Sequence, residues 1–445
     1  MKRQGATCKG LNKRVKDLGF DRVDDPRQHS KVELPLPTVL TALVAAMLTK
    51  ARSLRVVEHR TEQMVRKVGA WLGVKQRIAD NTFGKVLPRL PLKDLLACQH
   101  RLIKAEHRRG NLKPTRLPSG TVAIDGKNVA TLHWHDLCRV LDLDRNDATF
   151  EQLKALLAER YPEAQLCQSD NAMPYALMRV HTVTLISSAA AVCVHQRPIP
   201  GHTNENGALP DLLEELKAVY GRSRLFGLLT TDAGNTSVGA ASQIVEAGWH
   251  YFAQIKSVHG ELHGEAVRVL ARRRKARAHA TYSDTQNGQM VAYYLWRDDL
   301  SQHGWLNWTH ARQIIRVQRI AEDPHTGEVI SVGNRYYVTS LSVDEMSPKQ
   351  ALATSRAHWR CENETHWTDD AELAEDRRRH AWSRHPHGLL AVSVIRMMAL
   401  AILALARRLS RFGHTDETPS WTQVAEHFLL QLCGSILQTE AFDIV

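Results

Sequence analysis

The chain has 445 residues, and its seven cysteines are scattered without a Cys-x-x-Cys pair, which argues against a disulfide framework or a zinc knuckle and fits a reducing cytoplasm. One hydrophobic core seldom serves more than roughly 250–300 residues, so a chain of this length predicts two to four structural units. With 59 Lys and Arg against 47 Asp and Glu, the formal net charge of +12 favours a polyanionic partner such as nucleic acid, although a merely basic soluble protein has the same composition.

The N-terminal part predicts a small helical domain. Residues 1–30 are polar and basic and contain no apolar segment of signal-peptide length, so we do not expect secretion. Helical periodicity runs from Leu34 to about Leu92 with interruptions at prolines, which places a helical domain within residues 1–110. A basic linker follows, and residues 118–445 form the predicted second domain.

The first acid of interest is Asp125. It follows the apolar run Thr121–Ile124 and precedes a glycine, so its carboxylate is expected at the tip of a buried strand. A turn or a helix cap is the competing explanation for an aspartate in this position. Residues 128–178 then interrupt the β pattern and include a helix-like piece at Phe150–Tyr161, which predicts an insertion.

The second acid, Asp232, ends another apolar run, Leu225–Thr231. Between the two acids lie two adjacent β runs and a helix, and after Asp232 come a helix and a strand. The predicted order is therefore β β β α β α β, which is typical of an α/β fold of the RNase H-like type, a mixed sheet flanked by helices whose ligands lie at the carboxyl ends of strands. The segments concerned are residues 179–188, 189–199, 209–220, 225–231, 238–247 and 250–256.

The remainder of the chain predicts a β-rich insertion and a helical C-terminus. Several strand-like runs within 257–345 follow a basic helix, and Glu362 then lies in a helical segment. We expect helices at 385–445. Residues 388–407 are apolar enough for a membrane span, but Arg396 lies in their middle, so a buried or half-buried helix is favoured and no membrane partner is expected.

Two strand-end aspartates and one helical glutamate, Asp125, Asp232 and Glu362, could hold two divalent cations. Carboxylate oxygens suit the hard ion Mg²⁺, which takes its other ligands from water and phosphate. In such a site one ion activates water or a 3′-hydroxyl and the other stabilises the leaving oxygen. Neighbouring acids on the same helix as Glu362 compete with it for this role, Asp370 among them.

Other polar side chains are candidates for contacts to DNA. Lys127 and Lys256 could reach phosphate or simply be solvated at strand ends, and His358 and His366 lie four residues either side of Glu362, where they could approach a phosphate or pack between helices. Two basic runs suit a phosphate backbone, with a solvated basic face as the alternative. These runs contain Arg272, Arg273 and Arg274 in the first and Arg377, Arg378 and Arg379 in the second.

Several sequence blocks together resemble a known family. The blocks are Val122–Lys127, His202–Glu205, Tyr251–Lys256, Arg335–Leu341 and His358–Trp367. Their order is similar to that of the bacterial insertion-sequence transposases with a DDE site, particularly the branch with the H-repeat-associated proteins. The resemblance spans most of the chain and implies that Asp125, Asp232 and Glu362 are the catalytic metal ligands.

The resemblance also implies a function. A transposase of this kind binds the terminal inverted repeats of its insertion sequence, cleaves the DNA with Mg²⁺, for which Mn²⁺ can substitute, and transfers the strands to target DNA. Double-stranded DNA, as transposon ends and as target, is then the partner, and a homodimer on paired ends is expected. The expected location is the bacterial cytoplasm, at the nucleoid when DNA is bound.

The chain departs from the wider superfamily around its glutamate. The positions that usually carry Tyr, Arg and Lys hold Ser355, His358 and Asp369, and Arg356 or Arg360 could replace the missing phosphate contacts. An alternative function follows: a catalytically inactive or domesticated descendant that acts as a DNA-binding or regulatory protein. A structure-specific nuclease on the same core, which cleaves without joining, is a third possibility.

Overall fold

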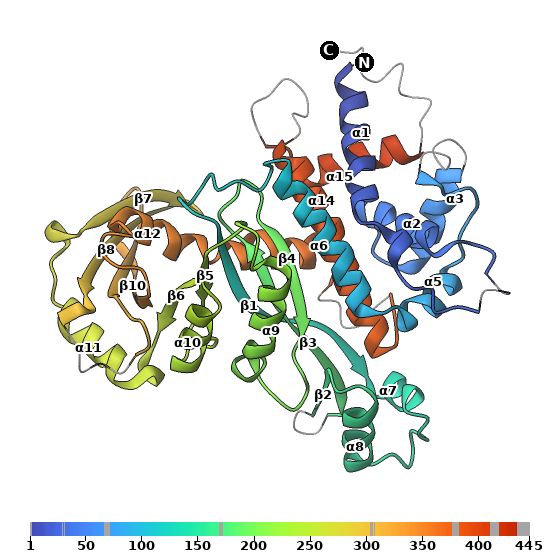
Figure 1. The fold of residues 1–445 in the computed structure, drawn as a ribbon, viewed down its shortest axis with the longest axis horizontal. Coiled ribbons are helices and arrows are strands. Elements are labelled where there is room, and N and C mark those ends of the chain that lie inside the picture. Colours follow the sequence, from blue (N-terminus) through green and yellow to red (C-terminus); the bar gives the residue numbers. More distant parts are fainter. Residues whose placement is uncertain are drawn as a thin grey trace.

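The computed structural model describes residues 2–28, 30, 32–65, 72–168, 172–302, 306, 308–375, 382–409 and 418–433. Its centre is a ten-stranded mixed sheet in the order β2-β3-β1-β5-β6-β10-β9-β8-β7, with β4 pairing on β3. Helices from both ends of the chain gather beside one half of this sheet, and the outer strands β7–β10 extend away from them (Figure 1).

The inner five strands have the RNase H-like arrangement that the sequence predicts. Three of them form an antiparallel meander, and the next two run parallel to the first. Helices connect the later strands, as the β β β α β α β order requires. The elements are β1 (Thr121–His133), β3 (Tyr175–Leu185), β4 (Val192–Pro198), α9 (Glu205–Tyr220), β5 (Leu228–Thr231), α10 (Val238–Glu246) and β6 (His250–Ile255).

The predicted insertion at 128–178 is shorter in the structure, because β1 continues to His133 and β3 already begins at Tyr175. These extensions pair with each other beyond a register shift near Asn128. They hold alternating apolar residues that bury a second core against the inserted helices. What remains between the strands is α7 (Trp134–Val140), α8 (Phe150–Arg160) and β2 (Ala164–Cys167).

The β-rich segment between Asp232 and Glu362 enlarges the main sheet. Its last strand pairs antiparallel with β6, from Tyr336 opposite Ile255 to Thr339 opposite Phe252. The helix α12 packs on one face of these strands. The predicted basic helix at 264–277 ends at Leu270 and is followed by a short 3-10 turn. The elements are α11 (Gly260–Leu270), β7 (Ala280–Gln286), β8 (Gln289–Asp299), β9 (Gln313–Glu322), β10 (Val329–Thr339) and α12 (Pro348–Ala357).

The N-terminal part is helical, as expected, and it packs directly on the central sheet. In α6 the Gln99 side chain donates a hydrogen bond of 2.9 Å to the carbonyl oxygen of Cys193 in β4. The largest hydrophobic core is shared by these helices, the sheet and the C-terminal helices. The division into domains of residues 1–110 and 118–445 therefore stays a prediction. The helices are α1 (Lys2–Asp17), α2 (Leu36–Leu48), α3 (Leu54–Val65), α5 (Asp80–Val86) and α6 (Leu92–Arg108).

Two helices close the described chain, α14 (Pro386–Leu409) and α15 (Trp421–Cys433). By length and composition α14 could cross a membrane, but its most apolar stretch is completely buried inside the fold. Arg396 is buried with it, lies 3.2 Å from Glu375 and stacks at 5.6 Å from the ring centre of Trp382. This confirms the prediction of a buried helix, because the arginine has an internal charge partner.

We predict that Gly120→Ala destabilises the fold. Backbone amides of Gly227 and Leu228 donate to the Gly120 carbonyl, and a methyl group at residue 120 would collide with the backbone of Leu225. Such overpacking at the entry of β1 and β5 should lower the free energy of unfolding by about 1–3 kcal/mol, measured by denaturant unfolding.

The matched control is Gly264→Ala in α11, where no atom lies within 4 Å of the added methyl group. Because alanine favours a helix over glycine, this variant should be unchanged or more stable by up to about 1 kcal/mol. Equal stability of the two variants would contradict the close approach of the strands at Gly120.

Candidate functional site

Asp125 and Asp232 lie at the same edge of two neighbouring parallel strands. Ile124 of β1 pairs with Thr231 of β5, so the residues that follow each of them are adjacent. The strand β5 ends at Thr231, whereas β1 continues and remains paired only with β3 beyond this point. Asp125 therefore lies within a strand and not at its tip as predicted, but beside the carboxyl end of β5.

Glu362 lies in a helical segment that changes from α-helix to π-helix around this residue. After α12 the backbone forms a π-helix, Cys361–His366, and then α13 (Trp367–Leu373). Short π segments occur frequently at functional sites. Burial raises the pKa of Asp125 to about 7, and the charges of Glu362 and Asp232 add to this effect. The three predicted acids are thus close enough to repel one another.

Glu205 is a fourth acid at this edge, and the sequence analysis did not identify it as a site residue. It opens α9, and its carboxylate accepts a hydrogen bond of 2.8 Å from Nδ2 of Asn235. The same amide donates to Asp232 at 3.0 Å. Glu205 packs against Gly126, where any side chain would collide with the carboxylate. Two features of the sequence could have indicated Glu205: the glycine that follows Asp125, and the position of this glutamate in the first turn of a helix with an asparagine N-cap.

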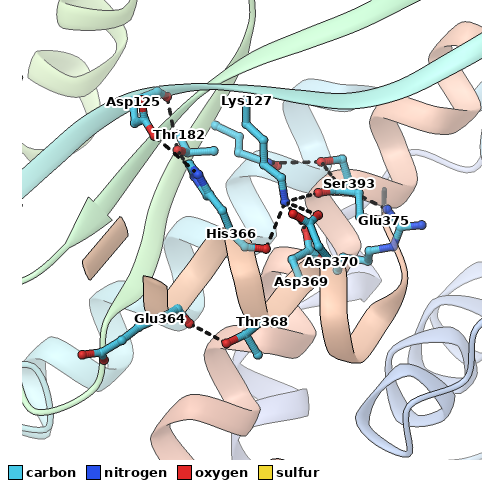
Figure 2. A network of polar contacts seen from close by, with 12 residues as sticks. Asp125, Lys127, Thr182, Glu364, His366, Thr368, Asp369, Asp370, Glu375 and Ser393 are labelled. Atoms are coloured by element: carbon cyan, nitrogen blue, oxygen red, sulfur yellow. Dashed lines mark hydrogen bonds and ion pairs between the residues drawn. The ribbon is translucent and has the colours of Figure 1, made fainter. Parts of the chain in front are cut away.

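His366 and His358 join the π-helix region to the strands that carry the aspartates. His366 Nε2 lies 2.8 Å from the Thr182 hydroxyl in β3, and its Nδ1 lies 3.5 Å from the Asp125 carboxylate (Figure 2). His358 Nδ1 lies 2.8 Å from the Thr230 hydroxyl in β5. Burial lowers the pKa of His366 to about 3 and that of His358 to about 4, so both are neutral near pH 7. Their contacts fit the packing alternative.

Lys127, one of the predicted phosphate contacts, is buried and pairs with carboxylates in the interior. Its buried ammonium group lies 3.3 Å from Asp369 and 3.1 Å from Asp370, and it also pairs with Glu375 (Figure 2). Burial alone would lower the pKa of Lys127, but the carboxylates, led by Glu375, outweigh it and raise the pKa. Asp370, the acid that competes with Glu362 in the sequence and a possible accessory site residue, is a partner of this lysine.

The Lys127 cluster continues to the buried helix α14. Burial disfavours the ionised form of Glu375, but the charges of Lys127 and Arg396 outweigh burial and lower its pKa to about 2. Burial and the charge of Glu375 raise the pKa of Asp369 well above its usual value. The cluster therefore ties β1, two residues after Asp125, to the helices that follow Glu362.

The predicted DNA-contacting arginines divide into buried and accessible groups. Arg360 is buried, donates to the Ser188 carbonyl at 3.0 Å and pairs with Glu364 at 2.7 Å, so it anchors the helix and is not available to phosphate. Arg356 is half-buried and stacks 3.5 Å from the ring centre of Tyr282.

The other basic candidates lie near the outer strands. Lys256, Arg272 and Arg274 are exposed. Arg273 pairs with Asp298 at 3.0 Å. Arg377, Arg378 and Arg379 lie outside the described residues.

The acids are chemically suited to a hard divalent cation. They offer only carboxylate oxygens, and burial together with neighbouring acids raises the pKa of Asp125, Glu205 and Glu362, which is the situation that a bound cation relieves. Within the described ranges, however, no three His, Cys, Asp or Glu side chains are already arranged closely enough to hold a metal ion.

We predict that Glu375→Gln lowers the free energy of unfolding by about 3–5 kcal/mol, because it leaves Lys127 and Arg396 with less compensation in the interior. The contribution of Glu375 is complete above the ordinary carboxyl pKa and is lost as pH falls toward about 2, so the difference from wild type should shrink in acid. Denaturant unfolding at pH 7 and pH 3 measures both effects.

The exposed Glu214→Gln in α9 is the matched control, with an expected change within about 0.5 kcal/mol. If both variants unfold at the same denaturant concentration, the buried cluster does not stabilise the fold.

Comparison with known proteins identifies a family. Residues 138–393 match the family model described as the transposase DDE domain, and this range contains both Asp232 and Glu362, whereas Asp125 precedes it. A search of curated proteins gives no match. The matched range covers more than half of the chain and agrees with the RNase H-like sheet described above. The chain therefore belongs to the family of transposases with a DDE domain.

Proposed function

We propose that this chain is an active transposase that binds the terminal inverted repeats of an insertion sequence, cleaves the DNA and transfers the strands to a target. The observation that supports this most directly is the parallel pairing of β1 and β5, which brings Asp125 beside Asp232, together with the effect of the Glu362 charge on the pKa of Asp125. Membership of the H-repeat-associated branch stays a prediction.

In this proposal Asp125, Asp232 and Glu362 hold Mg²⁺, for which Mn²⁺ can substitute. A bound divalent cation supplies a Lewis acid that activates the attacking oxygen and stabilises the leaving oxygen. The protein contributes orientation: Asn235 donates to Asp232 through both its backbone and its side-chain nitrogen, each at 3.0 Å. His366 Nδ1 lies 3.5 Å from the Asp125 carboxylate and restrains its position.

Double-stranded DNA is the proposed partner, both as transposon ends and as target. The net charge of +12 and the exposed Lys256, Arg272 and Arg274 support an electrostatic contribution to binding. A homodimer on paired ends is part of the proposal, because two ends are processed together. We place the protein in the bacterial cytoplasm, at the nucleoid when it is bound to DNA.

A silent DNA-binding descendant is the alternative, and one observation favours it. The superfamily has Tyr, Arg and Lys at three positions where the side chains of this chain point into the interior. Ser355 is buried, His358 contacts Thr230, and Asp369 pairs with Lys127. None of the three is placed to reach a phosphate backbone. This alternative predicts binding without cleavage.

We expect Asp232→Asn to abolish Mg²⁺-dependent cleavage and joining of a labelled duplex that carries the DNA flanking the coding sequence. Loss of one metal-binding carboxylate should cost about 4 kcal/mol of transition-state stabilisation, roughly a thousandfold in rate. Single-turnover assays that separate cleaved from joined product make this measurement.

The control is Asp211→Asn, an exposed aspartate in α9 that pairs with Arg197, and it should retain full activity. Equal cleavage by wild type and Asp232→Asn would reject the proposed site. Binding without cleavage by wild type would favour the silent descendant, and cleavage without joining would favour a structure-specific nuclease.

The raised pKa of Asp125 predicts competition between protons and Mg²⁺. Its pKa is about 7 without a cation, so at limiting Mg²⁺ the cleavage rate should fall by up to about tenfold per pH unit below neutrality. Because the cation binds the ionised form, a higher Mg²⁺ concentration should move the midpoint to lower pH. Rates measured across pH at two Mg²⁺ concentrations test this, and a midpoint that ignores Mg²⁺ would contradict the metal role of Asp125.

A further inference from the structure

A groove of about 710 Å³ runs from Glu362 over the outer part of the sheet. One wall is formed by α12 and the start of the π-helix, and the other by β8, β9 and β10. These outer strands and α12 lie together at the end of the molecule away from the N-terminal helices (Figure 1). The groove thus leads away from the proposed metal site along a surface that the catalytic scheme above does not use.

The charges in this groove favour an anion. Arginines 319, 335 and 356 line it, and Glu362 at its inner end is the only acid among the described lining residues. The remaining lining residues include amides, hydroxyls and aromatic rings. A phosphate chain that enters the site at Glu362 would therefore continue over a basic and aromatic surface.

Arg335 is the basic residue best placed beside Glu362. It projects from β10, is exposed, and its guanidinium carbon lies 4.2 Å from the ring centre of Trp359, three residues before Glu362. Within the described residues no carboxylate forms an ion pair with it. A guanidinium stacked on a ring keeps donors in its own plane free, in the fork geometry that matches a phosphate.

Arg356 occupies a similar position further along the groove. Its guanidinium carbon lies 3.5 Å from the ring centre of Tyr282 and 5.1 Å from that of Tyr293. Asp284 is its nearest carboxylate, at 3.9 Å and close to the surface, so this contact is weak. The groove therefore holds two arginines that stack on aromatic rings, Arg335 near Glu362 and Arg356 further from it.

We propose that this groove binds the phosphate backbone of one DNA strand, with Arg335 on the phosphate next to the one held at Glu362 and Arg356 on a phosphate further out. Trp359 is a positioning residue, because it fixes the plane of the Arg335 guanidinium. The inference rests on the proposed function for the identity of the DNA, and it adds the path of the strand and the residues that hold it.

The test measures binding of the flanking-DNA duplex by fluorescence anisotropy across a series of salt concentrations. Ca²⁺ replaces Mg²⁺ in the buffer so that the DNA is not cleaved. Arg335→Met should weaken binding roughly tenfold and reduce the slope of log affinity against log salt by about 1, because one phosphate contact is lost. Arg335→Lys keeps the charge but not the planar fork, so it should keep the slope while losing affinity.

A matched control is Arg268→Met in α11, which removes an exposed arginine that already pairs with Glu265, and it should change neither quantity. Single methylphosphonates placed around the cleaved bond locate the contact. A methylphosphonate at one of these phosphates should weaken binding to the wild-type protein by the same factor as the Arg335→Met substitution. The same methylphosphonate should not weaken binding to Arg335→Met any further.

Two results would overturn the inference: the same affinity and slope for Arg335→Met and Arg268→Met, or no methylphosphonate position that distinguishes wild type from Arg335→Met. If Arg335→Met does not fold, Arg335→Lys takes its place in the affinity comparison and in the methylphosphonate scan. Unchanged affinity of Arg335→Lys at every methylphosphonate position would then overturn the inference. If Arg335-dependent binding is found but wild type does not cleave in Mg²⁺, the catalytic proposal fails and the groove assignment stands. If wild type does not bind the duplex, both fail.

Discussion

The burial of carboxylates beside one another at one edge of the sheet is the constraint on which the candidate site depends. Asp125 lies beside Asp232 on neighbouring strands, and burial together with the charges of Glu362, Asp232 and Glu205 raises the pKa of Asp125 to about 7. Such an arrangement persists only when other contacts hold the backbone in place. Here the strand pairing, the Asn235 amide and the two histidines supply those contacts.

The basic side chains around this edge of the sheet fall into two groups. Lys127 and Arg360 point inward and fasten the helices after α12 to the sheet, whereas Arg335 and Arg356 face the groove. Asp369 stands where the superfamily usually has a lysine, and the ammonium group it meets comes instead from Lys127 on β1. The positive charge at this position is thus part of the interior.

Much of the fold follows from the sequence, because the inner strands are continuous apolar runs of the kind that a sheet covered on both faces requires. Those runs located the strands that carry or precede Asp125 and Asp232, although Asp125 lies within β1 and not at its tip. The strand β7 was not predicted, since Thr281–Thr285 is exposed and lacks an apolar pattern. The length of β1 was also missed, because Asn128 and the register shift beside it disguise the continuation to His133.

The side chains of the site were harder to predict, since their roles depend on contacts between distant segments. Lys127 looks like a solvated lysine until residues after Glu362 fold over it. Glu205 acquires its place only when α9 packs beside Gly126. Similarly, the π-helical turn at Glu362 has no signature in a pattern of helical spacing, and the contacts of His358 and His366 with two different strands appear only in the folded chain.

The position of α14 has a consequence for how the molecule is made. This helix lies near the end of the chain, yet it packs against α2, α6, β1 and β4 and completes the largest core. During synthesis the N-terminal helices and the sheet therefore emerge with their apolar faces uncovered until residue 409 has left the ribosome. A product shortened before Pro386 would expose this surface and be a substrate for chaperones and proteases.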